Sequence, residues 1–376
     1  MERKSKKSTV ATLIAIVVFY FLIFLLEKVV PGTHIVFAVL KKGAVYSLAA
    51  VSMNLLNGFT GLFSLGQAGF MLIGAYSYAI LTMPVEVKLG ESVYRYYDCI
   101  VGFQIGIVPG LIIAGLFAAA FAALIGLPVL RLKSDYLAIA TLGFAEIVRA
   151  FVQWDKLGPV TNSANTLKSY PSLNDVKIPF TNISMTPAFF VFLMSGICIA
   201  IIVLLVNSSY GRAFKAIRDD EIAAEAMGIN LFRHKELSFV ISSFFAGISG
   251  ALLAMFQYTV SAAQFKTAMT YEILLIVVIG GIGSITGSCI GSFLFIACSE
   301  WWLRFLDESK NNIAGLNILR PGFRNVVFSI VIMVVVLFFS KGIMGDRELS
   351  FKGIAGLFRK RPKKQLSAGK GDGGDE

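Results

Sequence analysis

The sequence has little charge, almost no histidine and few cysteines. Charged side chains make up 15% of the 376 residues, whereas soluble domains average roughly 25%. The 2 His and 4 Cys show no spacing that fits a disulfide framework, a zinc site or a histidine-based catalytic triad. No G-x-x-x-x-G-K-[ST] loop for nucleotide phosphates occurs either. We therefore expect that the chain is not an enzyme and binds no metal or cofactor of its own.

What the sequence has instead is long apolar runs. Hydrophobic residues make up 56% of the chain, and its mean hydropathy is +0.75. Many runs approach the ~18 to 20 residues that a helix needs to cross a bilayer. These features predict an all-α, polytopic helical membrane protein. Its candidate spans are 10–26, 43–57, 62–83, 102–130, 135–154, 187–206, 237–258, 271–303 and 322–339.

The net charge of +11 is distributed unevenly between the connections. Basic residues concentrate in 1–9, 131–133, 208–236 and 341–376. The segments 85–101, 155–186 and 304–320 are nearly balanced. Because Lys and Arg stay on the cytoplasmic side of a membrane, we expect both termini and the loop 208–236 in the cytoplasm, flanking a transmembrane domain over 10–340. The pattern favours the lipid bilayer over nucleic acid as a partner, with a basic, partly disordered tail.

The parity of the crossings constrains segment 271–303. With both termini inside, this segment has to begin and end on the outer side. As one helix it would measure about 50 Å, well beyond a hydrocarbon core of ~30 Å. We therefore expect two pieces that turn at "GGIGS" (280–284), which gives about ten spans. A re-entrant hairpin is the alternative for this segment.

Short, glycine-interrupted spans are typical of substrate paths, since broken helices are tolerated only where protein or a cavity surrounds them. Span 43–57 is short and runs into the glycine-containing "NGFTG" (57–61). The nearby polar side chains are candidates to line a translocation path: Asn54, Asn57, Ser64 and Gln67. By contrast, Gly283, Gly287 and Gly291 recur every four residues, which favours close helix packing over a path.

Span 135–154 carries Glu146 and Arg149 on one helix face. Their spacing allows an ion pair that lowers the free energy needed to place either charge in lipid. We favour a mutual pair that locks the helical bundle. The alternative is that Glu146, together with Thr141 on the same span, belongs to the polar lining of the path.

The most charged stretch, "GRAFKAIRDDEIAAEAMGIN" (211–230), lies between two apolar spans. Asp219 or Asp220 can cap a short helix there, and Gly228 provides a stop. A helix of about two turns is not stable alone, so it has to dock on something. Its acidic residues disfavour an anionic lipid surface, and a protein partner is the better interpretation.

Four segments resemble, in the same order, the membrane-spanning permease subunits of branched-chain amino-acid ABC importers. They are "NGFTGLFSLGQAGFMLIGAY", "LRLKSDYLAIATLGFAEIVR", "GRAFKAIRDDEIAAEAMGIN" and "VVIGGIGSITGSCIGS". The resemblance covers about 43–345. It implies an ABC-importer permease fold in a prokaryotic inner or plasma membrane. It also implies a second permease subunit, two cytoplasmic ABC ATPase subunits that use ATP, and an extracytoplasmic solute-binding protein.

The resemblance further implies that "EIAAEAMGI" docks into a groove of an ATPase subunit. The residues implied in this coupling are Arg212, Arg218, Asp220, Glu221, Ala223, Ala224, Glu225 and Gly228. The segments 158–172 and 305–324 depart from the family pattern. The resemblance makes branched-chain amino acids the main interpretation of the solute. The departures leave another amino acid, urea or a short amide as an alternative. A stand-alone secondary transporter or channel is disfavoured, because the spans lack several unpaired acids.

Overall fold

The computed structural model describes most of the helical bundle. The described residues are 20, 23, 27, 35–90, 93–94, 96–97, 99–132, 134–176, 185–302, 327, 330, 333 and 342–345. The expected spans 10–26 and 322–339 and the terminal segments 1–9 and 341–376 lie outside this set, apart from a few positions.

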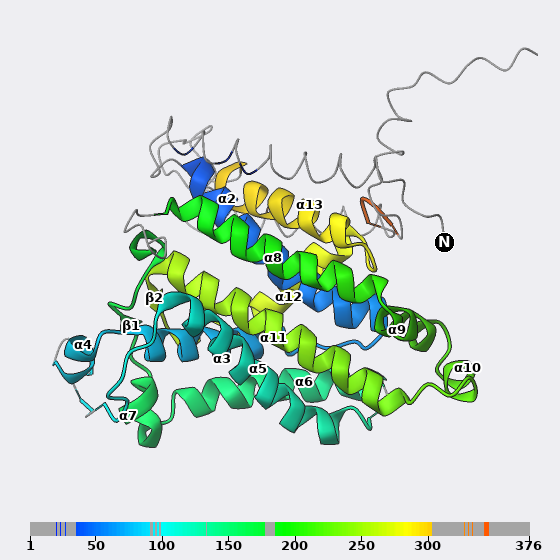
Figure 1. The fold of residues 1–376 in the computed structure, drawn as a ribbon, viewed down its shortest axis with the longest axis horizontal. Coiled ribbons are helices and arrows are strands. Elements are labelled where there is room, and N and C mark those ends of the chain that lie inside the picture. The colour runs from blue at the N-terminus through cyan, green and yellow to red at the C-terminus, as the bar shows by residue number, and fades with distance from the viewer. Residues whose placement is uncertain are drawn as a thin grey trace, which may run out of the picture.

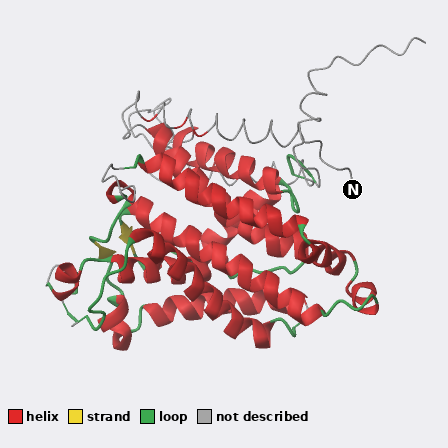
Figure 2. Cartoon of the chain, viewed as in Figure 1, coloured by secondary structure: helices red, strands yellow, loops and turns green. Residues whose placement is uncertain are grey.

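The described part is built almost entirely of helices (Figure 2), as the sequence predicts. The helices are α2 (Ile35–Asn54), α3 (Gln67–Thr82), α4 (Val85–Leu89), α5 (Ile107–Val129), α6 (Ser134–Val152), α7 (Gly158–Thr161), α8 (Pro187–Asn207), α9 (Ser209–Asp219), α10 (Glu221–Ala226), α11 (Leu231–Gln257), α12 (Thr267–Gly280) and α13 (Ile285–Ile296). Two π-helical turns extend α2 and α13, at Leu55–Thr60 and Ala297–Trp302. Strands β1 (Leu167–Lys168) and β2 (Thr259–Val260) form one antiparallel pair.

The long helices lie side by side, with α11 packed against α2, α3 and α5 (Figure 1). The short helices α9 and α10 lie at one end of the bundle, and α4, α7 and the strand pair lie at the opposite end. Within the described residues, four helices are long and apolar enough to cross a membrane: α5, α8, α11, and α2 with its π-helical turn. A fifth is α6, if the turn that ends at Thr161 is counted with it across a bend of 63°.

The second span is longer than the sequence suggests. The expected span 43–57 is wrong at both ends, because the helix begins at Ile35 and continues to Thr60. Two lysines inside it are tolerated because they have partners: Lys42 forms an ion pair with Glu300 beyond α13, and Lys41 lies 6.0 Å from the centre of the Phe256 ring. The break before α3 therefore falls at 61–66 and not at 57–61.

Segment 271–303 is divided as expected. Helix α12 ends at Gly280 and α13 begins at Ile285, so the chain turns at 281–284. The two helices approach closely, since a Cβ on Gly287 would lie only 2.2 Å from the carbonyl oxygen of Gly280. Gly291 packs against α12 in the same way, whereas Gly283 lies in the turn with a φ of 87°. The packing interpretation is thus confirmed for Gly287 and Gly291 and wrong for Gly283.

Asn54 connects the end of α2 to the α12–α13 turn. Its side chain is fully buried. The Nδ2 group donates to the carbonyl oxygens of Gly281 at 3.4 Å and Ser284 at 3.0 Å, and to the hydroxyl of Ser288 at 2.8 Å. The Oδ1 atom accepts from the backbone N–H of Gly283 at 2.8 Å. One buried amide therefore satisfies several polar groups of this turn.

Replacing Asn54 with alanine should destabilise the bundle. The change leaves buried backbone groups of the turn without partners, and we expect the free energy of unfolding to fall by about 1–3 kcal/mol. Thermal unfolding of the purified protein in detergent would measure the change.

The matched control is Asn207→Ala at the end of α8, where the amide is exposed and donates to the carbonyl oxygen of Val203. Equal shifts in the two variants would show that the turn does not depend on Asn54.

Candidate functional site

The charged segment 208–230 forms two short helices at one end of the bundle (Figure 1). Helix α9 begins at the cap Ser208 and buries Phe214 and Ile217. It contacts α8, α11 and the π-helical turn after α2. At its last turn, the Arg218 side chain donates to the carbonyl oxygen of Gly58 at 3.1 Å. This hydrogen bond connects α9 to the π-helical turn at the end of α2.

Helix α10 is closed at both ends by its own sequence. Asp220 caps it, as predicted for one of two candidates: Oδ1 accepts from the N–H groups of Ile222 at 2.8 Å and Ala223 at 3.0 Å. At the other end Gly228 has a φ of 85°. Its N–H donates to the carbonyl oxygen of Glu225, and that of Ile229 donates to Ala224, which is the Schellman pattern of a glycine-terminated helix. The predicted stop at Gly228 is confirmed.

Two of the α10 residues implied in coupling, Ala224 and Glu221, contact other parts of the same chain. Ala224 is only 4% exposed and packs against its own chain. Glu221 is bonded to Lys235 at 2.6 Å. The outward surface instead carries Ile222 at 82% and Met227 at 83% exposure.

Sequence reasoning missed Ile222 and Met227. Exposed alongside them are Ala223, Glu225 and Ala226. The available signal was that these two are the only large apolar residues between 219 and 228. We call the residues Ile222, Ala223, Glu225, Ala226 and Met227 the α10 surface.

The two arginines expected in the same region occupy different positions. Arg218 joins α9 to Gly58 and also pairs with Asp219 at 3.0 Å. Arg212 is exposed, and its guanidinium donates to the Ser209 hydroxyl at 3.3 Å. Arg218 is therefore part of the attachment of the helix pair, whereas Arg212 lies on its open side.

Four of the polar residues proposed for the translocation path gather around the break between α2 and α3. Asn57 is bonded to both backbone groups of Ser64, with Oδ1 accepting from its N–H at 3.1 Å. The Thr141 hydroxyl on α6 accepts from the N–H of Leu65 at 3.0 Å. Together these bonds hold the irregular backbone 61–66 between α2 and α6.

Gln67 starts α3 and bonds back to α2. Its Nε2 group donates to the carbonyl oxygen of Ala49 at 3.2 Å and to the Ser52 hydroxyl at 2.7 Å. Asn54 lies apart from the break and serves the α12–α13 turn. The structure thus places these residues at helix breaks, within hydrogen-bond networks; their contact with a solute stays a prediction.

Glu146 and Arg149 form the predicted ion pair on α6. The Arg149 Nη2 atom lies 2.5 Å from Glu146 Oε2. A third member was not expected: the Thr267 hydroxyl, at the start of α12, donates to Glu146 Oε1 at 2.5 Å. Glu146 therefore bridges α6 and α12 as well as neutralising Arg149.

The amino-acid sequence of this helical bundle matches a known protein family. The family of the branched-chain amino acid transport system permease component matches residues 35–340. The chain belongs to this family. It is accordingly a multi-pass membrane protein related to transport permeases.

Curated relatives agree with the family. The chain is 32% identical over 297 residues to the high-affinity branched-chain amino acid transport system permease protein LivM of Escherichia coli K12, covering 73% of this chain and 65% of the relative. It thus spans less than two thirds of that protein.

More distant relatives are matched over nearly their whole length. A probable LivM of Methanocaldococcus jannaschii is 22% identical, with 81% and 91% of the two chains covered. LivH of Escherichia coli K12 is 23% identical, with 82% and 93% covered. No solved structure matches the chain.

The ion pair on α6 makes a testable prediction. Removing one partner leaves the other charge unpaired in a poorly solvated site, whereas removing both leaves no unpaired charge. We expect Glu146→Gln and Arg149→Gln each to lower the yield of folded, monodisperse protein more than the double variant does. Size-exclusion chromatography of detergent extracts, prepared from membranes with matched expression, would measure these yields.

Thr267→Val is the matched control, because it removes a neutral donor to the same carboxylate and leaves the pair intact. Additive losses in the double variant would contradict the pairing.

Proposed function

We propose that the chain is a permease subunit of an ATP-driven importer for branched-chain amino acids. It would work with a second permease subunit, two cytoplasmic ATPase subunits that bind the ATP, and an extracytoplasmic solute-binding protein. The observation that carries this proposal is the α10 surface, where Ile222 and Met227 are exposed at the end of an apolar bundle. Large apolar side chains exposed on and beside a capped helix outside the apolar bundle favour a contact with another protein.

The geometry supports a route from the α10 surface into the membrane. Only Asp220 separates α10 from α9, and the two helices contact one another. Through Arg218 the pair contacts Gly58, three residues before the break at 61–66. That break is bonded to Asn57 and to Thr141 on α6. A displacement of α10 by an ATPase subunit would therefore reach the proposed path residues through contiguous contacts.

The ion pair on α6 removes one candidate site for a stand-alone ion-coupled transporter. Such transporters use unpaired intramembrane acids as ion sites, and Glu146 is neutralised by Arg149. Another amino acid, urea or a short amide would use the same architecture. Mass spectrometry of the ligand bound to the partner binding protein distinguishes these solutes.

We further propose that the membrane is a prokaryotic inner or plasma membrane, with both termini of the chain in the cytoplasm. Helix α9, which carries Arg212, Lys215 and Arg218, would face the cytoplasm together with α10. Helices α4 and α7 and the strand pair, at the opposite end of the bundle (Figure 1), would face outward and contribute to docking of the binding protein.

Charged substitutions on the α10 surface should uncouple the importer. Ile222→Asp and Met227→Asp place a charge where we expect an apolar contact, and Glu225→Lys inverts the neighbouring acid. We expect each to reduce co-purification of the ATPase subunits and the uptake of leucine, with membrane abundance unchanged. Uptake and ATPase recovery would be compared with the wild type at matched abundance.

The control is Leu89→Asp, which changes an equally apolar and 70% exposed side chain in α4 at the opposite end. Its ATPase recovery should equal that of the wild type. If all three α10 variants retain the ATPase and transport normally, the α10 surface is a solvated connection and the coupling mechanism is wrong.

The proposed orientation predicts where Cys99 is accessible. In a variant that keeps Cys99 as the single cysteine, an impermeant thiol reagent should label intact spheroplasts. Tyr96→Cys, at a position that is 77% exposed in the same loop, provides a second site that does not depend on the partial burial of Cys99. A single cysteine at Glu225 should react only after permeabilisation. The reverse pattern would invert the topology.

A further inference from the structure

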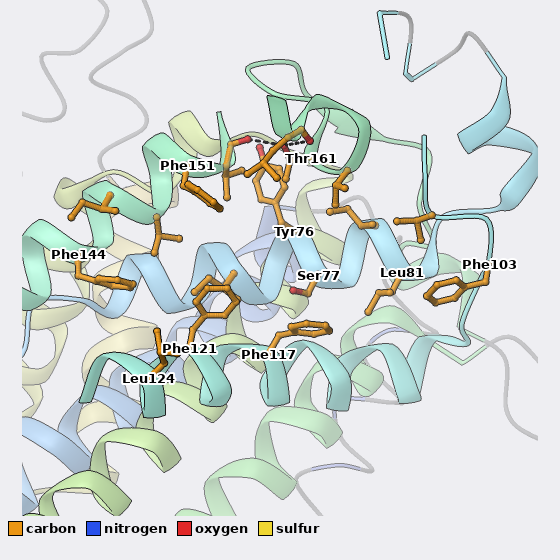
Figure 3. Close-up of a pocket in the computed structure, with 18 residues that line it drawn as sticks. Tyr76, Ser77, Leu81, Phe103, Phe117, Phe121, Leu124, Phe144, Phe151 and Thr161 are labelled. Carbon is orange, nitrogen blue, oxygen red and sulfur yellow. Dashed lines mark hydrogen bonds between the residues drawn. The ribbon is translucent and has the colours of Figure 1, made fainter. Parts of the chain in front are cut away.

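A groove of about 500 Å³ lies between α5 and α6, over α3 (Figure 3). Tyr76 and Ser77 of α3 lie on its floor, and phenylalanines of the two other helices lie on its sides. These include Phe117 and Phe121 of α5 and Phe151 of α6. Helix α6 packs mainly on α3 and makes few contacts with α5. The groove therefore separates two neighbouring helices.

No described residue covers the groove. Phe121 is 41% exposed, Phe117 is 45% and Ile147 is 63%. Helix α5 has 23 residues, which span about 35 Å and so cross the hydrocarbon core of a bilayer. The open side of the groove consequently lies at the depth of the lipid chains.

The lining excludes a free amino acid as the occupant. No charged side chain contributes to it, and its few polar side chains are those of Tyr76, Ser77 and Thr161. The Thr161 hydroxyl already donates to the carbonyl oxygen of Val152 at 2.7 Å. The Tyr76 hydroxyl is buried without a partner among the described residues, but no side chain of the lining bears a charge that could pair with an ammonium or a carboxylate, so the groove suits an uncharged apolar chain.

The outer end of the groove carries a cation at the depth of a lipid headgroup. Leu157 lines the groove, and the adjacent Lys156 ammonium lies 5.4 Å from the centre of the Trp154 ring. Lys156 forms no ion pair with any described residue. The neighbouring carboxylate of Asp155 instead accepts from the hydroxyls of Tyr97 and Ser163. Tryptophan and lysine at the end of a spanning helix are typical of the membrane–water interface.

We propose that this groove binds one phospholipid, with an acyl chain between α5 and α6 and the phosphate at Lys156. The lipid would fill the separation between the two helices and support α6 beside its bend. This binding depends on neither the solute nor the ATPase subunits, so its test is separate from that of the transport function.

A photoreactive residue inside the groove tests the proposal. Phe121 is replaced by p-benzoylphenylalanine in the full chain, which is purified with its partners from phospholipid membranes, washed extensively with detergent and irradiated. We expect a covalent adduct with the mass of a phospholipid at this position. The same residue at Leu204, which is 71% exposed on α8, should lose its lipid to washing and give no such adduct.

Two further substitutions identify the binding determinants. Ser77→Trp fills the floor of the groove and should abolish the adduct at Phe121. Lys156→Glu lies on the surface, leaves the packing intact, and should reduce the adduct by removing the partner of the phosphate. A protein adduct at Phe121 would assign the groove to a helix of another subunit. Absence of a lipid adduct there, an equal one at Leu204, or one insensitive to Lys156→Glu would each overturn the proposal.

Discussion

Every polar group placed inside a bilayer needs a partner from the protein, because no water is available to supply one. The bundle depends on this constraint most strongly at its two helix breaks. At 281–284 the partner is Asn54, one buried amide that serves donors and acceptors of the turn. At 61–66 the partners are Asn57 and Thr141, which bond backbone groups of Ser64 and Leu65. Interrupted helices are stable here because side chains of other segments supply the hydrogen bonds that the backbone at the breaks lacks.

The same constraint applies to the charges within the spans. Glu146, Arg149 and Thr267 form one network that joins α6 to α12. Lys42 pairs with Glu300, far along the chain. The Lys42–Glu300 pair fixes α2 relative to the π-helical turn after α13, since separating them would leave both charges without a partner. The Glu146–Arg149 pair lies within α6, and the Thr267 hydroxyl connects it to α12. Packing of small and apolar residues completes the contacts between the helices.

Local features of the site were predictable from the sequence. The cap at Asp220, the stop at Gly228, the turn at 281–284 and the pair between Glu146 and Arg149 depend on residues close together in the chain, and the structure confirms each of them. The resemblance of four ordered segments also identified the family.

Features that depend on distant segments were not predictable in the same way. The early start of α2 requires the partner of Lys42, which lies 258 residues away. The orientation of α10, which buries Ala224 and exposes Ile222, follows from how that helix packs on α9 and α11. The spacing of apolar residues cannot show which face of a six-residue helix is buried. So few positions are too short a segment for an apolar stripe to repeat.

Exposed apolar side chains have different meanings at the two depths of this molecule. In the groove between α5 and α6, exposure to lipid carries no penalty, so apolar character alone identifies no ligand; the cation at Lys156 supplies the additional evidence. On α10, outside the apolar bundle, the surrounding solvent is water. Leaving Ile222 and Met227 in water forgoes roughly 1.5–3 kcal/mol for each side chain that a partner could bury. Association with another protein that buries these side chains would therefore stabilise the short helix.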